Sequence, residues 1–193
     1  MADALQRSPG SSSRASTREE ELRASAISRA REAAGTRSGI HGDDHWRRVA
    51  EVGLIIARRE EVSAHVVLLF AILHDCRREN DGHDPGHGPR AAEVARTLGH
   101  EALAISPEEL DRLAEAMHDH DRGLVTEDTL IGACWDADRL DLERVGITPH
   151  LRFISTPAGS DPDLIDYCAD FLRDAPSWDE LAQHAERIME KTR

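Results

Sequence analysis

The chain has 193 residues, enough for one domain with a hydrophobic core of its own. It carries 37 Asp and Glu against 24 Lys and Arg, and this formal net charge of −13 disfavours duplex DNA or RNA as a partner. No stretch reaches membrane-spanning length, the N-terminus lacks the apolar core of a signal peptide, and Cys76, Cys134 and Cys168 form no C-x-x-C pair, so we expect a cytoplasmic protein with reduced thiols and no membrane partner.

Capping residues and apolar spacing predict helices along most of the chain. Residues 1–15 are rich in Ser, Gly and Arg, and we expect them to form a disordered tail. The predicted helices cover residues 17–34, 43–59, 63–75, 90–98, 107–118, 126–146, 162–173 and 177–191. No segment shows the alternation of β-branched residues that is typical of strands. The sequence therefore predicts an all-α fold, with one domain over residues 16–193 that ends in a helical C-terminal extension.

An adjacent pair, His74 and Asp75, follows the apolar run Val66–Leu73. A helix that is apolar on every side belongs inside a protein. A carboxylate at the buried end of such a helix is costly unless it is paired or binds a metal. The pair is therefore a candidate set of metal ligands, and a structural hydrogen bond between the two side chains is the alternative.

Two other residues are predicted to point inward from separate helices. His45 lies on the apolar face of the helix over residues 43–59, and Asp138 lies on the apolar face of the helix over residues 126–146. At the same spacing Asp136 points to nearly the opposite side. Each inward residue could instead be a core or capping residue. Together with the His-Asp pair they make two imidazoles and two carboxylates, which suit Mn²⁺, Fe²⁺, Co²⁺, Zn²⁺ or Mg²⁺.

Three local motifs surround these residues: Asp43–Val49 (DDHWRRV), Leu73–Asp75 (LHD) and Asp136–Asp141 (DADRLD). Their order resembles that of the HD-domain superfamily of metal-dependent phosphohydrolases, over about half the chain. The resemblance implies an HD-type helical bundle with a metal-binding core in residues 41–146. It also implies that one divalent metal ion is bound by His45, His74, Asp75 and Asp138.

A second metal site is implied by two more segments. His87, in HGPRAA, resembles the H-x-x-x-G-A element that serves a second metal in some HD proteins, although Ala replaces the Gly here. The segment MHDHDRG supplies His118 and His120, and we prefer His120 because His-x-x-Gly leads into the next loop. If His87 and His120 both bind, the centre is dinuclear and Asp75 bridges the ions. The alternative is that these histidines are polar loop residues.

The resemblance implies hydrolysis of a small phosphate ester or nucleotide by a metal-activated water, which Asp75 would hold or deprotonate. Arg78, four residues after His74, is our candidate for the phosphate contact, because Arg binds phosphate oxygens through a planar fork. We expect Arg139 to pair with a neighbouring carboxylate and Glu79 to be exposed at a helix end. The related hydrolases of (p)ppGpp carry an acidic pair after His-Asp; its absence here disfavours that substrate.

Two other functions compete with hydrolysis. A di-iron HD-fold oxygenase would need a full six-ligand set that includes His87 and either His120 or His118. A catalytically silent module that binds a nucleotide or a partner protein would need exposed apolar surface on the last two predicted helices. The intact ligand set favours an enzyme.

Overall fold

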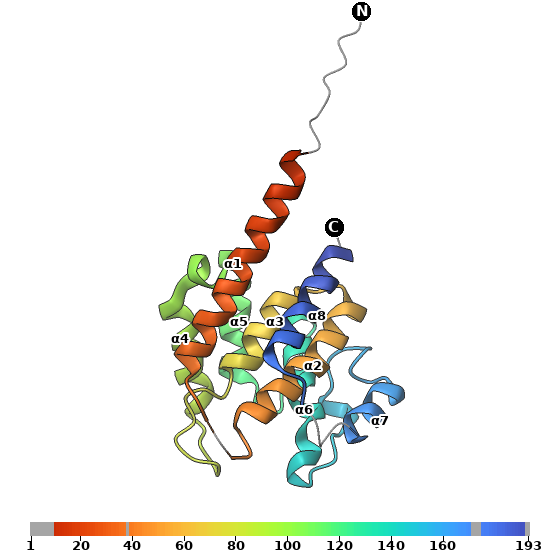
Figure 1. Ribbon diagram of the computed structural model, residues 1–193. Helices are drawn as coiled ribbons and strands as arrows, with labels where there is room; N and C mark the ends of the chain where they lie inside the picture. The colour runs from red at the N-terminus through yellow and green to blue at the C-terminus, as the bar shows by residue number, and fades with distance from the viewer. Residues whose placement is uncertain (1–9, 38, 171–174, 192–193) are drawn as a thin grey trace, which may run out of the picture.

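The computed structural model describes residues 10–37, 39–170 and 175–191 (Figure 1). Within these ranges every regular element is a helix and no strand occurs, which confirms the all-α prediction. The α-helices are α1 (Gly10–Ala34), α2 (Asp43–Glu60), α3 (Ala64–Leu73), α4 (His87–Leu103), α5 (Pro107–Asp119), α6 (Thr129–Leu140), α7 (Pro162–Asp170) and α8 (Trp178–Lys191). Two 3-10 helices, η1 (Leu142–Val145) and η2 (Leu151–Phe153), lie between α6 and α7.

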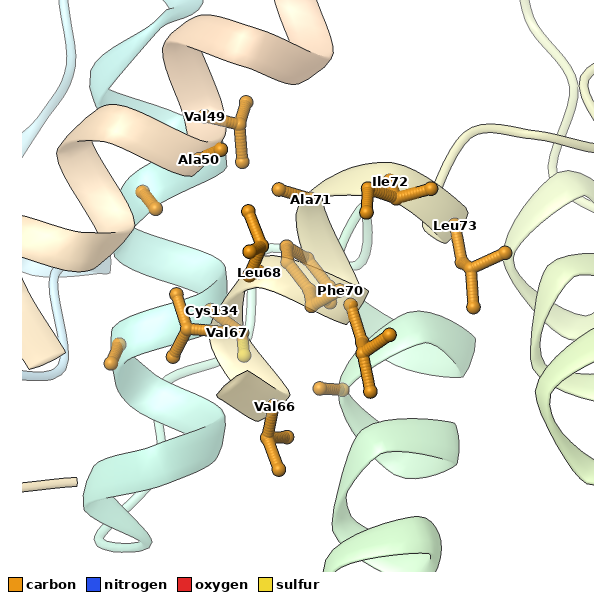
Figure 2. Close-up of a cluster of buried hydrophobic side chains, with 14 of the residues drawn as sticks. Val49, Ala50, Val66, Val67, Leu68, Phe70, Ala71, Ile72, Leu73 and Cys134 are labelled. Carbon is orange, nitrogen blue, oxygen red and sulfur yellow. The ribbon is translucent and has the colours of Figure 1, made fainter. Parts of the chain in front are cut away.

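Helix α3 forms the centre of the hydrophobic core, and all ten of its residues are buried. Helices α1, α2, α5, α6 and α8 all pack against it. Its side chains Val67, Leu68 and Phe70 belong to the buried cluster in Figure 2. Helix α2 approaches α3 closely at Gly53, where an added Cβ atom would lie 2.5 Å from Val67 Cγ1. Each fully buried aliphatic side chain contributes about 1.5–3 kcal/mol, so this helix is a main source of stability.

Side-chain caps fix the starts of three helices. Ser63, the residue at which the sequence predicts this helix to begin, caps α3 by accepting a hydrogen bond from a backbone N–H of the first turn. Ser106 and Glu109 form a capping box at the start of α5. Asp128 accepts two backbone N–H groups at the start of α6. The cap on α6 places its start at Thr129, so the helix predicted over residues 126–146 is shorter at this end.

The ends of other helices differ from the sequence prediction. Helix α1 already begins at Gly10, so residues 10–15 are helical rather than a disordered tail, and the rest of the predicted tail lies outside the described residues. Between Ser11 and Ala34 no Gly or Pro interrupts the chain, and a helix once nucleated extends at low cost. Helix α4 begins three residues early, at His87, and bends at Gly99, where φ is +78°.

Helix α6 ends at Leu140, and η1 continues the chain with a tighter turn. The helix predicted over residues 162–173 is observed as α7, and its predicted end lies outside the described residues. Helix α8 packs against α2 and α3. Its Trp178 Nε1 donates to Asp43 Oδ1 at 2.8 Å, so the C-terminal helix covers the core beside the motif that contains His45.

Two sequence expectations concern the surroundings of the protein. Among the described helices, none combines the length and the apolar character that crossing a membrane requires. Cys76, Cys134 and Cys168 are buried free thiols, as the spacing of the cysteines predicted.

Candidate metal centre

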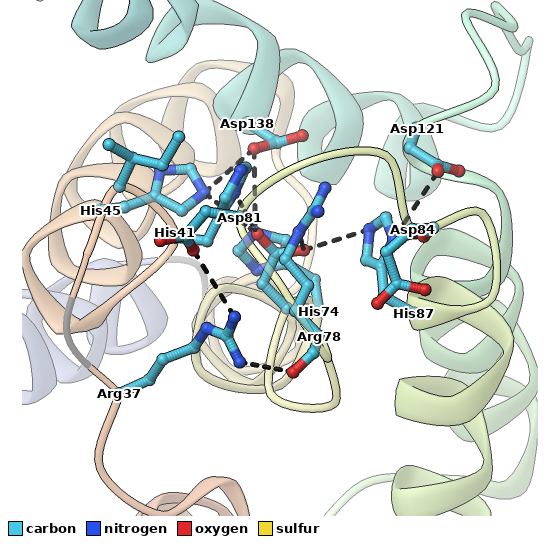
Figure 3. Close-up of polar contacts among 12 residues, drawn as sticks. Arg37, His41, His45, His74, Arg78, Asp81, Asp84, His87, Asp121 and Asp138 are labelled. Atoms are coloured by element: carbon cyan, nitrogen blue, oxygen red, sulfur yellow. Dashed lines mark hydrogen bonds and ion pairs between the residues drawn. The ribbon is translucent and has the colours of Figure 1, made fainter.

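Four of the predicted ligands meet near the C-terminal end of α3 (Figure 3). His45 lies in the first turn of α2, His74 and Asp75 follow α3, and Asp138 lies in the last turn of α6. The Nε2 atom of His45 is 3.2 Å from His74 Nε2 and 3.3 Å from Asp138 Oδ1. Asp75 Oδ2 lies 3.9 Å from His45 Nε2 and 3.8 Å from His74 Nε2. We call these four side chains the first cluster.

The other oxygen of Asp75 faces a second group of histidines. Asp75 Oδ1 lies 3.1 Å from His87 Nε2 and 3.4 Å from His120 Nε2, and the two Nε2 atoms are 2.9 Å apart. His87 is the first residue of α4, and His120 directly follows α5. His118 lies elsewhere, with a 41% exposed side chain that contacts Asp119. The second cluster therefore consists of His87, His120 and the shared Asp75.

The distances within both clusters fit the coordination of a metal ion. Two ligand atoms that each lie about 2.1 Å from an ion are about 3.0 Å apart at octahedral angles and about 3.4 Å apart at tetrahedral angles. The nitrogen–nitrogen and nitrogen–oxygen separations given above run from 2.9 Å, between His87 and His120, to 3.9 Å, between His45 and Asp75. Small side-chain movements would therefore complete either geometry.

The direction of the hydrogen bonds gives a second test of the fit. His45 Nδ1 contacts Asp141 Oδ2 at 2.7 Å, and His74 Nδ1 contacts the carbonyls of Phe70 and Ala71. In the second cluster Nδ1 of His87 contacts the carbonyl oxygen of Asp84, and Nδ1 of His120 contacts that of Met117.

All these partners are acceptors, so Nδ1 carries the proton in each ring. In a neutral imidazole the other nitrogen is then a bare lone pair. The lone pairs of His45 and His74 face each other, with 3.2 Å between the two Nε2 atoms. Those of His87 and His120 do the same at 2.9 Å. This arrangement is unfavourable unless a proton or a cation lies between them, and fixing Nδ1 in this way is how proteins orient metal-binding histidines.

The protonation states of His74, Asp75 and Asp138 suit a metal ion. Burial opposes protonation of His45 and His120, but neighbouring carboxylates raise the pKa of both, so a metal ion would displace a proton from these two rings. Burial lowers the pKa of His74 to about 3, which keeps the imidazole neutral at physiological pH. Burial opposes ionisation of Asp138, but the hydrogen bond with His45 and the neighbouring histidines hold its pKa below the ordinary value. Burial also opposes ionisation of Asp75. The electrostatic interaction with His74 and the hydrogen bonds with His120 and His41 outweigh this effect of burial, so the pKa of Asp75 is lowered as well. Neutral imidazoles and ionised carboxylates are the forms that bind metals.

Asp75 is held by contacts on both of its oxygens. Arg78 Nε donates to Oδ1 at 3.0 Å, and His41 Nδ1 lies 2.9 Å from Oδ2. Arg78 reaches this carboxylate from the turn after α3, not from a continuing helix as the spacing from His74 suggested. Its Nη1 donates to the carbonyl of Gly82. The guanidinium therefore orients Asp75 and also lines the neighbouring cavity.

The sequence analysis missed Asp141, which supports the first cluster from behind. Its side chain is 4% exposed, and it accepts from Arg48 Nε at 2.6 Å as well as contacting His45 Nδ1. Asp141 lies three residues after Asp138 in DADRLD, so helical spacing alone could have predicted that the two side chains lie on the same side. A buried carboxylate behind a metal-binding histidine raises the basicity of the ligand nitrogen.

Two predictions within the same motif need correction. Asp136 does not point away from the core: it is fully buried and accepts hydrogen bonds from the backbone N–H groups of Ser155 and Thr156 at 2.8 Å. The loop after η2 folds over this face of α6, which helical periodicity cannot reveal. Arg139 forms no ion pair with a described carboxylate, and its Nη1 donates instead to the carbonyl of Phe153. Glu79 is exposed, as predicted.

A cavity of about 250 Å³ opens beside the two clusters. Asp75, Asp138 and His120, which belong to the two clusters, line it. Arg78, Arg139 and Arg144 supply positive charge, and the cavity is also lined by Pro149, His150, Phe153 and Ile154. The clusters are therefore accessible to a small ligand.

Comparisons with models of protein families, with curated proteins and with solved structures find no match to the chain. The resemblance to the HD superfamily therefore stays a prediction from the local motifs.

Proposed function

We propose that this protein is a metal-dependent phosphohydrolase with a dinuclear centre, acting in the cytoplasm on a small phosphate ester. The observation that supports the proposal is that four imidazole Nε2 atoms lie within 3.9 Å of the carboxylate of Asp75 or Asp138, with each Nδ1 atom facing an acceptor. The three buried free cysteines agree with a reducing compartment.

Each metal ion would have its own set of ligands. The residues suited to the first ion are His45, His74, Asp75 and Asp138, and those suited to the second are His87, His120 and Asp75. Nitrogen ligands favour iron, cobalt or zinc over magnesium, while manganese accepts both nitrogen and oxygen. When bound, such ions would polarise phosphoryl oxygens and lower the pKa of water to near neutrality.

The protein's own residues would hold and orient the reactants. The contacts of Asp75 on both oxygens and its lowered pKa favour a role in holding water over a role in deprotonating it, because a weak base is a poor proton acceptor. Arg78 would contact a phosphate oxygen through the part of its guanidinium that faces the cavity. Asp138, with a 16% exposed side chain, faces the same space.

An oxygenase is the second candidate, since the six side chains gathered here are also the set that a di-iron oxygenase would need. A module that binds without turnover is the third. Oxygen dependence separates the first two, because ester hydrolysis proceeds without O₂.

Metal analysis of the purified protein, together with an anaerobic phosphatase assay over small esters and nucleotides, tests the proposal. We expect close to two metal ions per chain, and phosphate release that His74→Ala or Asp138→Ala reduces by more than about 100-fold, with helical content unchanged. His83→Ala is the matched control, because His83 is exposed on the loop before α4.

Full activity in either ligand variant with its metal retained would refute the assignment. Turnover only in the presence of O₂, with iron bound, would favour the oxygenase.

A further inference from the structure

Arg139 is a buried cation whose hydrogen bonds are incomplete. The residue is 6% exposed, and its Nη2 has no hydrogen-bond partner among the described residues. Its Nη1 donates to the carbonyl of Phe153, and the guanidinium lies 5.3 Å from the ring centroid of Trp135. The side chain is therefore fixed in position. Its Nη2 is closed off from solvent, but other atoms of the residue line the cavity beside the metal centre.

The charge of Arg139 is also unpaired. Asp136 and Asp138 are near enough to favour its charged form, but within the described part of the chain no carboxylate lies within ion-pair distance. Asp136 is committed to Ser155 and Thr156 instead. A buried charge without a partner costs several kcal/mol, and a ligand that carries the opposite charge would recover much of that cost.

The other two arginines of the cavity differ from Arg139. Arg144 donates from Nε to the carbonyl of Ile40 and from Nη1 to that of Asp141, and its Nη2 lies 3.4 Å from His41 Nδ1. Arg78 is tied to the bridging carboxylate. Arg139 is thus the guanidinium of the cavity that no described carboxylate pairs with, whereas Arg78 lies beside Asp75 and Arg144 beside Asp141.

We propose that Arg139 binds a second anionic group of the substrate, distinct from the phosphate that faces the metal centre. This inference rests on the proposed phosphohydrolase function. The substrate class is a small phosphate ester with a distal carboxylate or a second phosphate. At about 250 Å³ the cavity is below the range of about 300–1,000 Å³ that is usual for drug-sized ligands, which favours such a compact molecule over a nucleotide.

Binding of non-hydrolysable phosphonates to the full-length, Mn²⁺-loaded protein, measured by calorimetry, tests this role without turnover. We expect 3-phosphonopropionate or 1,3-propylenediphosphonate to bind about 10-fold to 100-fold more tightly than propylphosphonate. One charge-assisted hydrogen bond provides a gain in affinity of this size. The tighter of the two identifies the distal anion as carboxylate or phosphate.

Arg139→Gln should remove this preference and leave the affinity for propylphosphonate within about threefold, and Arg139→Lys should retain part of it. Arg122→Gln is the matched control, because the Arg122 side chain is 51% exposed and lies outside the cavity lining. Equal affinities of the wild-type protein for the three phosphonates, or a preference that survives in Arg139→Gln, would overturn the inference.

If the variants fold poorly, the affinities of the wild-type protein for the three phosphonates still test the inference. If the wild-type protein binds none of them, the inference is contradicted. Hydrolysis of simple esters without a distal-anion preference would sink this inference alone. If the wild-type protein prefers phosphonates with a distal anion but hydrolyses no ester, the proposed function alone is refuted.

Discussion

At the residue scale, the orientation of each histidine depends on what its Nδ1 atom contacts. Three of the four histidines contact a carbonyl that lies three residues earlier in the chain: that of Ala71 for His74, Asp84 for His87 and Met117 for His120. Such local contacts arise wherever a histidine occupies the right place in a helical turn. His45 differs, because its acceptor, Asp141, comes from a distant part of the chain.

The pKa of His120 predicts how the metal-free protein responds to pH. Burial opposes protonation of this ring, but the hydrogen bond to Asp75 and the charges of Asp138 and Asp75 raise its pKa to about 9, above the ordinary value of 6.5. The stabilisation from its protonated form is complete below pH 6.5 and is lost as the pH rises through 9. We therefore expect the free energy of unfolding to fall, by at most about 3 kcal/mol, over this range.

Urea unfolding of the chelated protein at pH 6.5 and pH 9 measures this change. His120→Gln should weaken the dependence on pH, and adding metal should do the same because the ion replaces the proton. A chelated wild-type protein that is equally stable at both pH values would contradict the prediction.

At the element scale, the second cluster depends on close contact between the start of α4 and the end of α5. A Cβ on Gly88 would lie 2.6 Å from the carbonyl oxygen of Met117 and 2.8 Å from that of His118. Backbone oxygens cannot move aside as a flexible side chain can. The glycine thus allows His87 and His120, from two different helices, to come within 2.9 Å of each other.

Gly88→Ala should therefore separate α4 from α5 and disturb the second cluster more than the first. We expect a stability loss of about 1–3 kcal/mol and a fall from two bound metal ions per chain toward one. Thermal unfolding and metal analysis measure these effects. Arg96→Ala, at an exposed position of the same helix, is the control and should keep both ions. Two tightly bound ions in Gly88→Ala would show that the contact does not position the cluster.

At the scale of the whole molecule, the candidate ligands come from five separate places around the core. They lie in α2, just after α3, at the start of α4, just after α5 and in α6. A metal ion bound to them would link elements that are far apart in the sequence. Ligand binding to the native state alone stabilises it by about 2.7 kcal/mol when the ligand is at 100 times its dissociation constant.

Chelation should accordingly lower the thermal midpoint of the wild-type protein. For a chain of this size a loss of about 2.7 kcal/mol corresponds to roughly 5–11 °C. Differential scanning calorimetry with and without EDTA measures the shift. The His74→Ala variant should respond far less, since it lacks a ligand of the first cluster. An unchanged midpoint in the wild-type protein would argue that no structural metal is bound.

The sequence by itself determined the helical class, the central buried helix and the residues that point inward. Residues Val66–Leu73 are apolar on every side, and such a helix has only the interior to occupy. The same local spacing identified His45 and Asp138. It could not reveal that Asp136 is buried, because the covering loop around Ser155 is remote in the sequence.

Only the tertiary structure decided which side chains meet. The choice of His120 over His118 depends on how α5 ends against α4, and the support from Asp141 depends on how α6 crosses α2. The free donor of Arg139 likewise follows from the position of the loop that contains Phe153. Helical periodicity is a local property that tells which face of a helix is buried. The partner of that face is set by packing between elements far apart in the chain, which local spacing does not encode.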